Sequence, residues 1–217
     1  ARGIVADEMR KRGVDLQCGV NVCKIEKTNS GVLITDTKNE KIEFDAIMFA
    51  TGRIPKTMDL FSKNLSLELG NKGEIIVDNY SQTRIPSIFA VGDVTNRVNL
   101  TPVAIHEAMA FVETVFRGHP SQVDHDLIPT AIFTQPEMGT VGLSEEDAAA
   151  LGPIEVFVAN FRAMRHSFVG KGDKSFIKLV ICAKSRKLQG CQIIAPQASE
   201  LIQLLGIAIK MGATKED

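Results

Sequence analysis

Apolar residues near the start of the chain recur in the patterns of β-strands. They alternate with polar residues over 14–25, and they recur over 32–35 after a Thr-Asn-Ser-Gly turn. A third apolar run, 42–49, follows a Lys-Asn turn and is continuous over 46–50. Alternation is typical of half-buried strands, whereas a continuous run is typical of a strand buried on both faces of a parallel sheet. The pattern therefore predicts a helix end over 4–11 and then a β-meander that ends in a buried parallel strand.

The middle of the chain has shorter apolar runs that are separated by turns. The runs at 75–77 and 87–91 predict two strands, and a Gly-Asp pair follows the second one directly. A long apolar-rich stretch then begins at Thr101 and Pro102. Threonine before a helix and proline in its first turn are typical of a helix start, so we expect a helix over 102–117.

The last part of the chain mixes strand and helix patterns. Ser144 followed by acidic residues predicts the N-cap of a helix over 144–150, and an apolar-rich stretch before Gly212 predicts another over 200–210. Strands are expected at 131–133, 141, 154–159, 175–182 and 188–194. This mixture is typical of a separate α+β unit.

Turns in the sequence suggest where domains meet. The ATGRIP segment at 50–55 interrupts the apolar pattern, and we place a boundary there. The predicted domains are 1–53, 54–125 and 126–217. The chain begins inside a predicted helix and stops just past another, so we expect it to be a piece of a longer protein.

Composition excludes several classes of function. The 217 residues include 25 basic and 26 acidic side chains, so the net charge of −1 gives no reason to expect nucleic acid or an anionic membrane as a partner. The longest apolar runs are too short to cross a bilayer. Four cysteines are few for a disulfide scaffold and suit a reducing cytosol, so a cytoplasmic location is expected. The four histidines lack companions at metal-ligand spacing, so no metal site is expected.

The strongest chemical signal is the Gly92-Asp93 pair at the end of a predicted buried strand, eight residues before Thr101. A carboxylate at a strand end can accept hydrogen bonds from a polyol, and glycine allows a ligand to approach the backbone closely. The start of the following helix offers free N–H groups and a positive dipole end to an anionic ring. The alternative is an ordinary strand–loop–helix with an aspartate at the strand end.

Five segments occur in an order that resembles the pyridine nucleotide-disulfide oxidoreductases. They are ATGRIP at 50–55, FAVGDV at 89–94, LTPVAI at 100–105, FTQPEMGTVGL at 133–143 and KMGATK at 210–215. The LTPVAI segment is most similar to the glutathione and trypanothione reductase branch of the family. The resemblance implies α/β segments of three-layer FAD- and NAD(P)-binding domains, followed by an α+β interface (dimerisation) domain. It also implies a homodimer that passes hydride from NADPH through FAD to oxidised glutathione.

The resemblance assigns residues to the two cofactors. Asp93, with Gly92, matches the residue that binds the ribityl chain of FAD, and Thr101 matches a backbone contact to the flavin ring. The nicotinamide side is matched by Gly52, Leu100 and Ala131. Arg53 follows the first of these and has two open interpretations, a site residue or a structural ion pair.

The same resemblance implies that essential parts are missing, so no catalytic residue is assigned in this chain. No G-x-G-x-x-G phosphate turn occurs. Cys18 and Cys23 have the C-x4-C spacing of the family's redox pair, but they lie in a predicted strand, where their side chains would face opposite sides. His119 before Pro120 resembles the family's catalytic base, but it follows the end of the long helix, and a solvated loop histidine is the simpler interpretation.

The sequence leaves two candidates for the disulfide substrate. Animal-type glutathione reductases have an arginine where this chain has Met109, whereas plant-like, bacterial and trypanothione reductases lack it. Trypanothione or another small disulfide is therefore the alternative substrate. An assembly module that dimerises from about Leu127 onward through the helix ending near Met211, without catalysis, is the alternative from another class.

Overall fold

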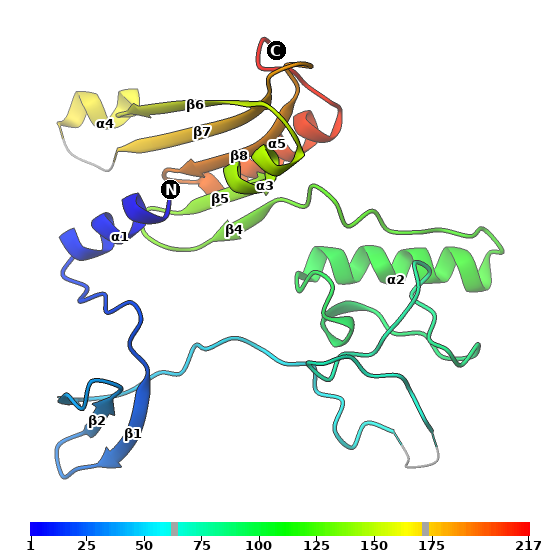
Figure 1. Ribbon diagram of the computed structural model, residues 1–217, viewed down its shortest axis with the longest axis horizontal. Helices are drawn as coiled ribbons and strands as arrows, with labels where there is room; N and C mark the ends of the chain where they lie inside the picture. The colour runs from blue at the N-terminus through cyan, green and yellow to red at the C-terminus, as the bar shows by residue number, and fades with distance from the viewer. Residues whose placement is uncertain (62–64, 171–173) are drawn as a thin grey trace. The chain divides into compact units, whose positions relative to one another are not determined.

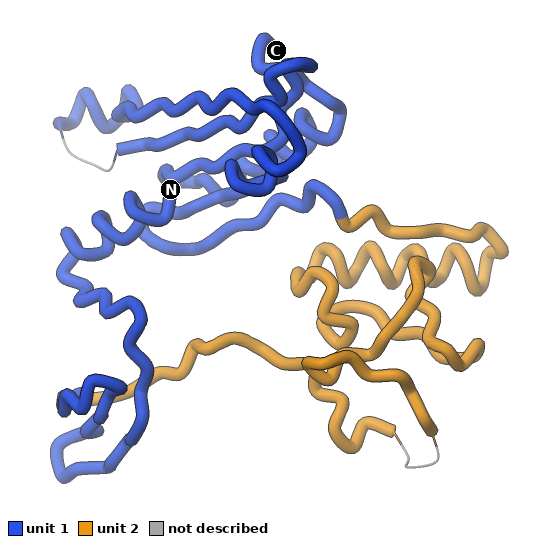
Figure 2. The backbone as a smooth tube through the Cα atoms, in the orientation of Figure 1, with its two compact units in different colours: residues 1–44, 126–217 blue, residues 45–125 orange. Residues whose placement is uncertain are grey.

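The chain forms two compact units in the computed structural model, which describes residues 1–61, 65–170 and 174–217 (Figure 1). Unit 1 consists of residues 1–44 and 126–217, and unit 2 consists of residues 45–125 (Figure 2).

The first segment of unit 1 confirms the predicted helix and a three-stranded meander, although the first strand begins at Val22 rather than at 14 and the third ends at Phe44 rather than at 49. Helix α1 (Arg2–Lys11) precedes an antiparallel sheet of order β1-β2-β3. The strands are β1 (Val22–Lys27), β2 (Val32–Asp36) and β3 (Lys41–Phe44). At the turn between β2 and β3, a side-chain oxygen of Asp36 accepts hydrogen bonds from the N–H groups of Lys38 and Glu40, both at 2.8 Å. This turn chemistry fixes the register of the hairpin.

The buried parallel strand expected at 46–50 is wrong. The segment has no strand conformation, and Met48 and Phe49 are 86% and 63% exposed. A central strand needs a neighbour on each side to pair its N–H and C=O groups. Neither sheet of the described residues includes this segment, so its apolar side chains have no sheet in which to be buried.

Unit 2 contains one long helix and many turns. The two strands expected at 75–77 and 87–91 are each reduced to an isolated bridge, Leu69 with Ile75 and Gln82 with Phe89. The short 3-10 helix η1 (Gly92–Thr95) and the helix α2 (Thr101–Phe116) follow. The predicted N-cap is also wrong, since Leu100 occupies that position without a side-chain cap and Thr101 is the first helical residue.

The second segment of unit 1 confirms the predicted α+β arrangement. Its sheet is antiparallel with the order β4-β5-β8-β7-β6. The strands are β4 (Thr130–Ile132), β5 (Met138–Gly142), β6 (Ile154–Phe161), β7 (Ser175–Cys182) and β8 (Leu188–Ile194). The helices are α3 (Glu145–Leu151), α4 (Met164–Val169) and α5 (Ala198–Lys210). The short helix α4 was not expected, because it has no capping side chain to mark its start.

Helix α5 forms the core of this unit with β5 and β8. Val141, Cys191 and Ile193 of the sheet pack in one cluster with Ile202 and Ile209 of the helix. Burial raises the pKa of the Cys191 thiol to about 11, so this cysteine is a neutral core side chain. As expected from the sequence, the Ser144 hydroxyl caps α3 by accepting a hydrogen bond from the Asp147 N–H at 3.1 Å.

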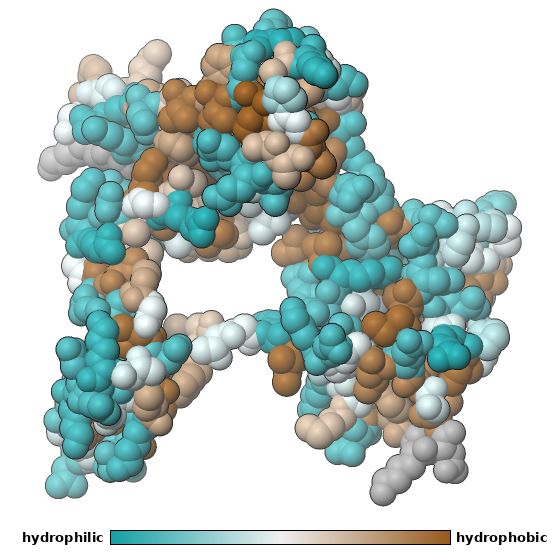
Figure 3. Space-filling view, in the orientation of Figure 1, coloured by the Kyte–Doolittle hydropathy of each residue, from teal (hydrophilic) through white to brown (hydrophobic). Residues whose placement is uncertain are grey.

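Apolar side chains also remain on the surface of both units (Figure 3). On α2 the exposed residues include Ile105, Met109 and Phe116, and on α5 they include Leu204 and Ile207. Exposed apolar groups on one helix face are typical of a surface that another polypeptide covers. None of the helices in the described residues is both long and apolar enough to cross a membrane.

A carboxylate from the loop before β5 caps the start of α5, and its removal has a predictable pH signature. Glu137 accepts hydrogen bonds from the Ser199 hydroxyl at 2.6 Å and the Ser199 N–H at 3.1 Å. These two bonds, the hydroxyl's first, lower the pKa of Glu137 below its usual value of 4.5. The stabilisation is therefore complete above pH 4.5 and is lost as the pH falls through the lowered pKa.

We expect Glu137→Gln to lower the free energy of unfolding by about 1 kcal/mol at pH 7, since a neutral acceptor replaces a charged one. The difference from the unsubstituted chain should shrink as the pH falls below 4.5. Urea unfolding between pH 7 and pH 3 measures both effects. Glu200→Gln, which removes a carboxylate from the first turn of the same helix, is the control. A difference that stays constant over this pH range would contradict the capping role.

Candidate functional site

The candidate site is a pocket of about 380 Å³ within unit 2. Two segments that are distant in the sequence form its walls, the turn after residue 52 and the segment that contains η1. The lining residues are Arg53, Ile54, Pro55, Lys56, Asp93, Val94 and Asn99. The structure thus brings the predicted Asp93 together with Arg53, whose role the sequence left open. Its position in the pocket favours the interpretation as a site residue.

A sharp change of backbone direction presents Asp93 to this pocket. Val91 is extended with φ −132° and ψ 155°, and Gly92 then has φ +75°. A β-carbon on Gly92 would lie 3.1 Å from the β-carbon of Ala104 on α2, so glycine is required both for the positive φ and for the close approach. The Thr95 hydroxyl donates to the Gly92 carbonyl at 2.8 Å and closes the turn. Asp93 itself is exposed and able to accept hydrogen bonds from a ligand.

The start of α2 is the second polar element of the site. Leu100 is extended and Thr101 begins the helix, so the Thr101 N–H has no acceptor within the helix. Thr101 is exposed, and η1 packs against α2. A carboxylate and a helix N-terminus therefore lie on two elements that contact each other, as the sequence predicted.

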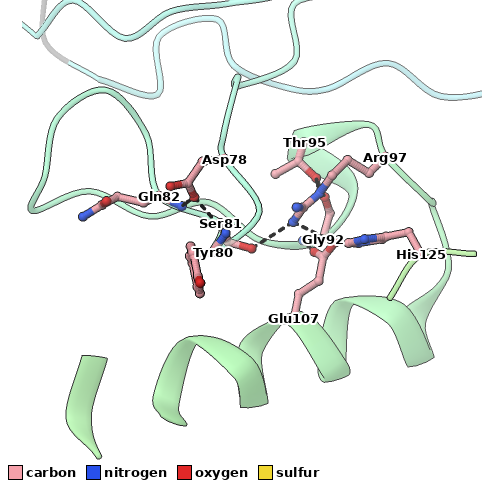
Figure 4. A network of polar contacts seen from close by, with 9 residues as sticks. All are labelled: Asp78, Tyr80, Ser81, Gln82, Gly92, Thr95, Arg97, Glu107 and His125. Carbon is pink, nitrogen blue, oxygen red and sulfur yellow. Dashed lines mark hydrogen bonds and ion pairs between the residues drawn. The ribbon is translucent and has the colours of Figure 1, made fainter. Parts of the chain in front are cut away.

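A buried carboxylate, which the sequence analysis missed, connects these two elements (Figure 4). Glu107 of α2 is 1% exposed. Its carboxylate accepts a hydrogen bond from the Gly92 N–H at 2.6 Å and forms a second one with His125 at 2.7 Å. It also makes an ion pair with Arg97 at 2.8 Å. One signal in the sequence could have revealed it, because Glu107 lies one helical turn after the buried Val103 and so on the buried helix face.

The remaining predicted site residues lie in different surroundings. Gly52 is exposed with φ +104°, directly before the pocket residue Arg53. Leu100 is the half-buried N-cap of α2. Ala131 is a half-buried residue of β4, in unit 1.

The two sequence features that imitate catalytic groups lie outside the pocket. Cys18 and Cys23 are exposed free thiols, although Cys18 lies in a turn before β1 rather than in the expected strand. The His119 side chain is 78% exposed, and its nearest charged partner is Glu113 at 3.4 Å.

The residues of the pocket are able to bind rather than to react. Asp93 offers acceptors to hydroxyl groups, and the two cations, Arg53 and Lys56, give the same pocket a positive potential that suits an anionic ligand. No thiol or imidazole is among the lining residues that the structure describes. Within the described ranges, no group of three or more His, Cys, Asp or Glu residues could hold a metal ion. These features fit a polyhydroxylated, negatively charged cofactor.

Almost the whole chain matches one known protein family. Residues 1–108 match the family model described as pyridine nucleotide-disulphide oxidoreductase, and residues 128–217 match the dimerisation domain of that family. The glutathione reductase of Burkholderia cepacia is 42% identical over 98% of this chain and 48% of its own length. A trypanothione reductase of Trypanosoma congolense is 35% identical over 94% of this chain and 42% of its own length.

A solved structure has a similar fold. The HOCl-induced flavoprotein disulfide reductase RclA from Escherichia coli matches with a TM-score of 0.87 at 24% identity, over 96% of this chain and 48% of that one. The mixed α/β fold class predicted from the sequence is therefore confirmed. This chain spans about half the length of the curated relatives it matches.

Proposed function

We propose, from the premise that this chain belongs to the pyridine nucleotide-disulphide oxidoreductase family, that it forms part of an NADPH-dependent flavoprotein that reduces oxidised glutathione. The 42% identity with a glutathione reductase supports this substrate. The observation that carries the proposal is the pocket in which Asp93 lies beside Arg53 and Lys56, next to the segment that leads into α2. FAD, when bound, would transfer reducing equivalents from NADPH to a disulfide.

In this proposal the chain's own residues bind and orient the cofactors. Asp93 accepts hydrogen bonds from the ribityl hydroxyls, and Gly92 allows the ligand to approach the backbone. The Thr101 N–H and the positive end of the α2 dipole stabilise negative charge on the flavin ring. Gly52 and Leu100 of unit 2 face the nicotinamide side.

The proposed protein contains more than this sequence. The chain matches about half of each relative, and its cysteines at 18 and 23 are exposed and outside the pocket. We therefore assign the redox cysteine pair, the phosphate-binding turns and the catalytic base to segments that this sequence lacks. The proposed domain limits are 1–53 for the NAD(P)H-binding part, 54–125 for the FAD-binding part and 126–217 for the interface domain. Four free cysteines support a reducing compartment such as the cytoplasm.

A hybrid enzyme tests this function. In it, the present sequence replaces the matching 48% of the Burkholderia cepacia glutathione reductase. We expect the hybrid to bind FAD and to oxidise NADPH in the presence of oxidised glutathione, while the 217-residue chain alone shows only background oxidation. A folded, flavin-loaded hybrid without glutathione-dependent turnover would contradict the proposal, and turnover by the chain alone would contradict its inactivity.

Trypanothione disulfide is the second candidate substrate, because a trypanothione reductase is 35% identical to this chain. Parallel assays of the hybrid with the two disulfides separate them. A higher kcat/KM with trypanothione disulfide would replace glutathione as the proposed substrate.

We also propose a homodimer that uses α5, in agreement with the dimerisation-domain match over residues 128–217. Leu204 and Ile207 lie on the exposed side of this helix and are 66% and 61% exposed.

We expect Leu204→Lys to convert a dimer into a monomer, because association would bury an unpaired charge. Sedimentation of the chain measures this change. Leu151→Lys on α3, at an equally exposed leucine, is the matched control and should leave the dimer intact. A Leu204→Lys chain that remains dimeric would exclude α5 as the interface.

A further inference from the structure

A single buried carboxylate joins the two cofactor-facing elements of unit 2. Glu107 lies on the second turn of α2, the helix whose first residue is Thr101. Its carboxylate accepts the Gly92 N–H at 2.6 Å, and Gly92 directly precedes Asp93. At 1% exposure this carboxylate is shielded from water, so its contacts are stronger and more costly to disturb than surface contacts.

Two cationic or protonatable partners complete the group. One oxygen of Glu107 contacts both Arg97 at 2.8 Å and His125 at 2.7 Å, while the other oxygen accepts the Gly92 N–H. Arg97 in turn donates to the hydroxyl of Ser81 at 2.9 Å and to that of Thr95 at 3.3 Å. Figure 4 shows Glu107 pointing from α2 toward this group, with Arg97 and His125 on either side. The network therefore fixes both ends of η1, at Gly92 and at Thr95.

We infer that Glu107 is a positioning residue that sets the geometry of the flavin site. It acts through the backbone of Gly92, which determines where Asp93 points, and through α2, which carries the N-terminal N–H groups. A ligand held between the Asp93 carboxylate and the α2 N-terminus depends on the distance between η1 and α2. Glu107 sets this distance, because it lies on α2 and accepts the N–H of Gly92 at the start of η1. The inference rests on the proposed function, since it requires that FAD occupies this site.

Glu107→Gln is a sharp test because the amide has the same shape but the wrong pattern of donors. A carboxylate accepts on both oxygens, and here both oxygens face N–H donors. In glutamine one of the two oxygens is replaced by an NH2 group, which is a hydrogen-bond donor. This group would face another donor, either the Gly92 N–H or the Arg97 guanidinium. The contact with η1 or the contact with Arg97 must then open. A displacement of about 1 Å at a binding group costs on the order of 10²-fold in site function.

The experiment measures FAD binding by the apoenzyme of the hybrid described above. We expect the Kd for FAD to rise about 10–100-fold in Glu107→Gln, at a temperature at which the protein remains folded. At saturating FAD, the visible circular dichroism of the bound flavin should also change, because its polar contacts are displaced. Glu113→Gln removes a carboxylate paired with Arg117 on the same helix, away from η1, and should leave both readouts unchanged.

The outcomes separate the inference from the proposed function. If the unsubstituted hybrid binds no FAD, the proposed function fails and the inference fails with it. If the unsubstituted hybrid binds FAD, and Glu107→Gln binds it within twofold with the same dichroism, the inference alone is overturned, even when the melting temperature falls.

If Glu107→Gln does not fold, Arg97→Lys decides the matter. Lysine keeps the charge but carries its three donors on one atom. It therefore cannot reproduce the contacts that Arg97 makes from two separate nitrogens, Nε to Thr95 and Nη2 to Ser81 and Glu107. A rise in the Kd for FAD that is smaller than the rise expected for Glu107→Gln supports the inference, and an unchanged Kd overturns it.

Discussion

Gly142→Ala should lower the free energy of unfolding of the chain by about 2–5 kcal/mol, the sum of left-handed backbone strain and overpacking. Gly142 ends β5 with φ +74°, where it pairs with Gly190 of β8. A β-carbon there would lie 2.2 Å from the Gln189 carbonyl oxygen, a backbone atom. That oxygen accepts the Leu143 N–H at 2.8 Å, so it cannot move without a loss of strand pairing.

Two control variants separate strain from overpacking in urea unfolding experiments. Gly212→Ala has a similar φ of +79° but meets only the flexible end of Lys187, so it should cost about 1–2 kcal/mol. Gly190→Ala has no positive φ but would meet the Leu143 carbonyl oxygen at 2.1 Å, so it should cost about 1–3 kcal/mol. A loss below about 1 kcal/mol in Gly142→Ala would show that β5 and β8 do not pair as described.

The second large effect concerns the proposed ribityl contact. We expect Asp93→Ala in the hybrid enzyme to raise the Kd for FAD about 10–150-fold. Hydrogen bonds to a charged group contribute about 1.5–3 kcal/mol, and each 1.4 kcal/mol corresponds to a factor of ten. Asp93 is exposed at the surface of its turn, so the folded state should lose little stability, which makes the effect specific to binding.

Fluorescence titration of the apoenzyme with FAD measures this change. Asp45→Ala, an exposed carboxylate that does not line the pocket, should bind FAD as the unsubstituted hybrid does. Equal affinity of the Asp93→Ala and Asp45→Ala variants would exclude the assignment of Asp93 to the cofactor.

Elements that depend on local pattern could be predicted from the sequence. The positions of α2 and α5 follow from long apolar stretches, and α3 follows from the cap provided by Ser144. The turn before Asp93 follows from the glycine that it requires. These features depend on neighbours within a few residues, so the sequence is sufficient to identify them.

Features that depend on distant partners could not be predicted in this way. The run at 46–50 has the composition of a buried strand, but burial depends on neighbouring strands that no local pattern specifies. Helix α4 could not be predicted either, because it is short and has no capping side chain at its start.

The sequence by itself determined the family motifs, the presence of the helices α2, α3 and α5, and the Gly92-Asp93 pair before α2. Only the tertiary structure decided that Arg53 lines the same pocket as Asp93, and that Gly92, Arg97 and His125 meet at Glu107. Gly92 and His125 lie 33 positions apart in the sequence, and a glutamate in an apolar helix has many possible partners. Its partners are selected when the chain folds, because a buried charge must be paired before it can be removed from water.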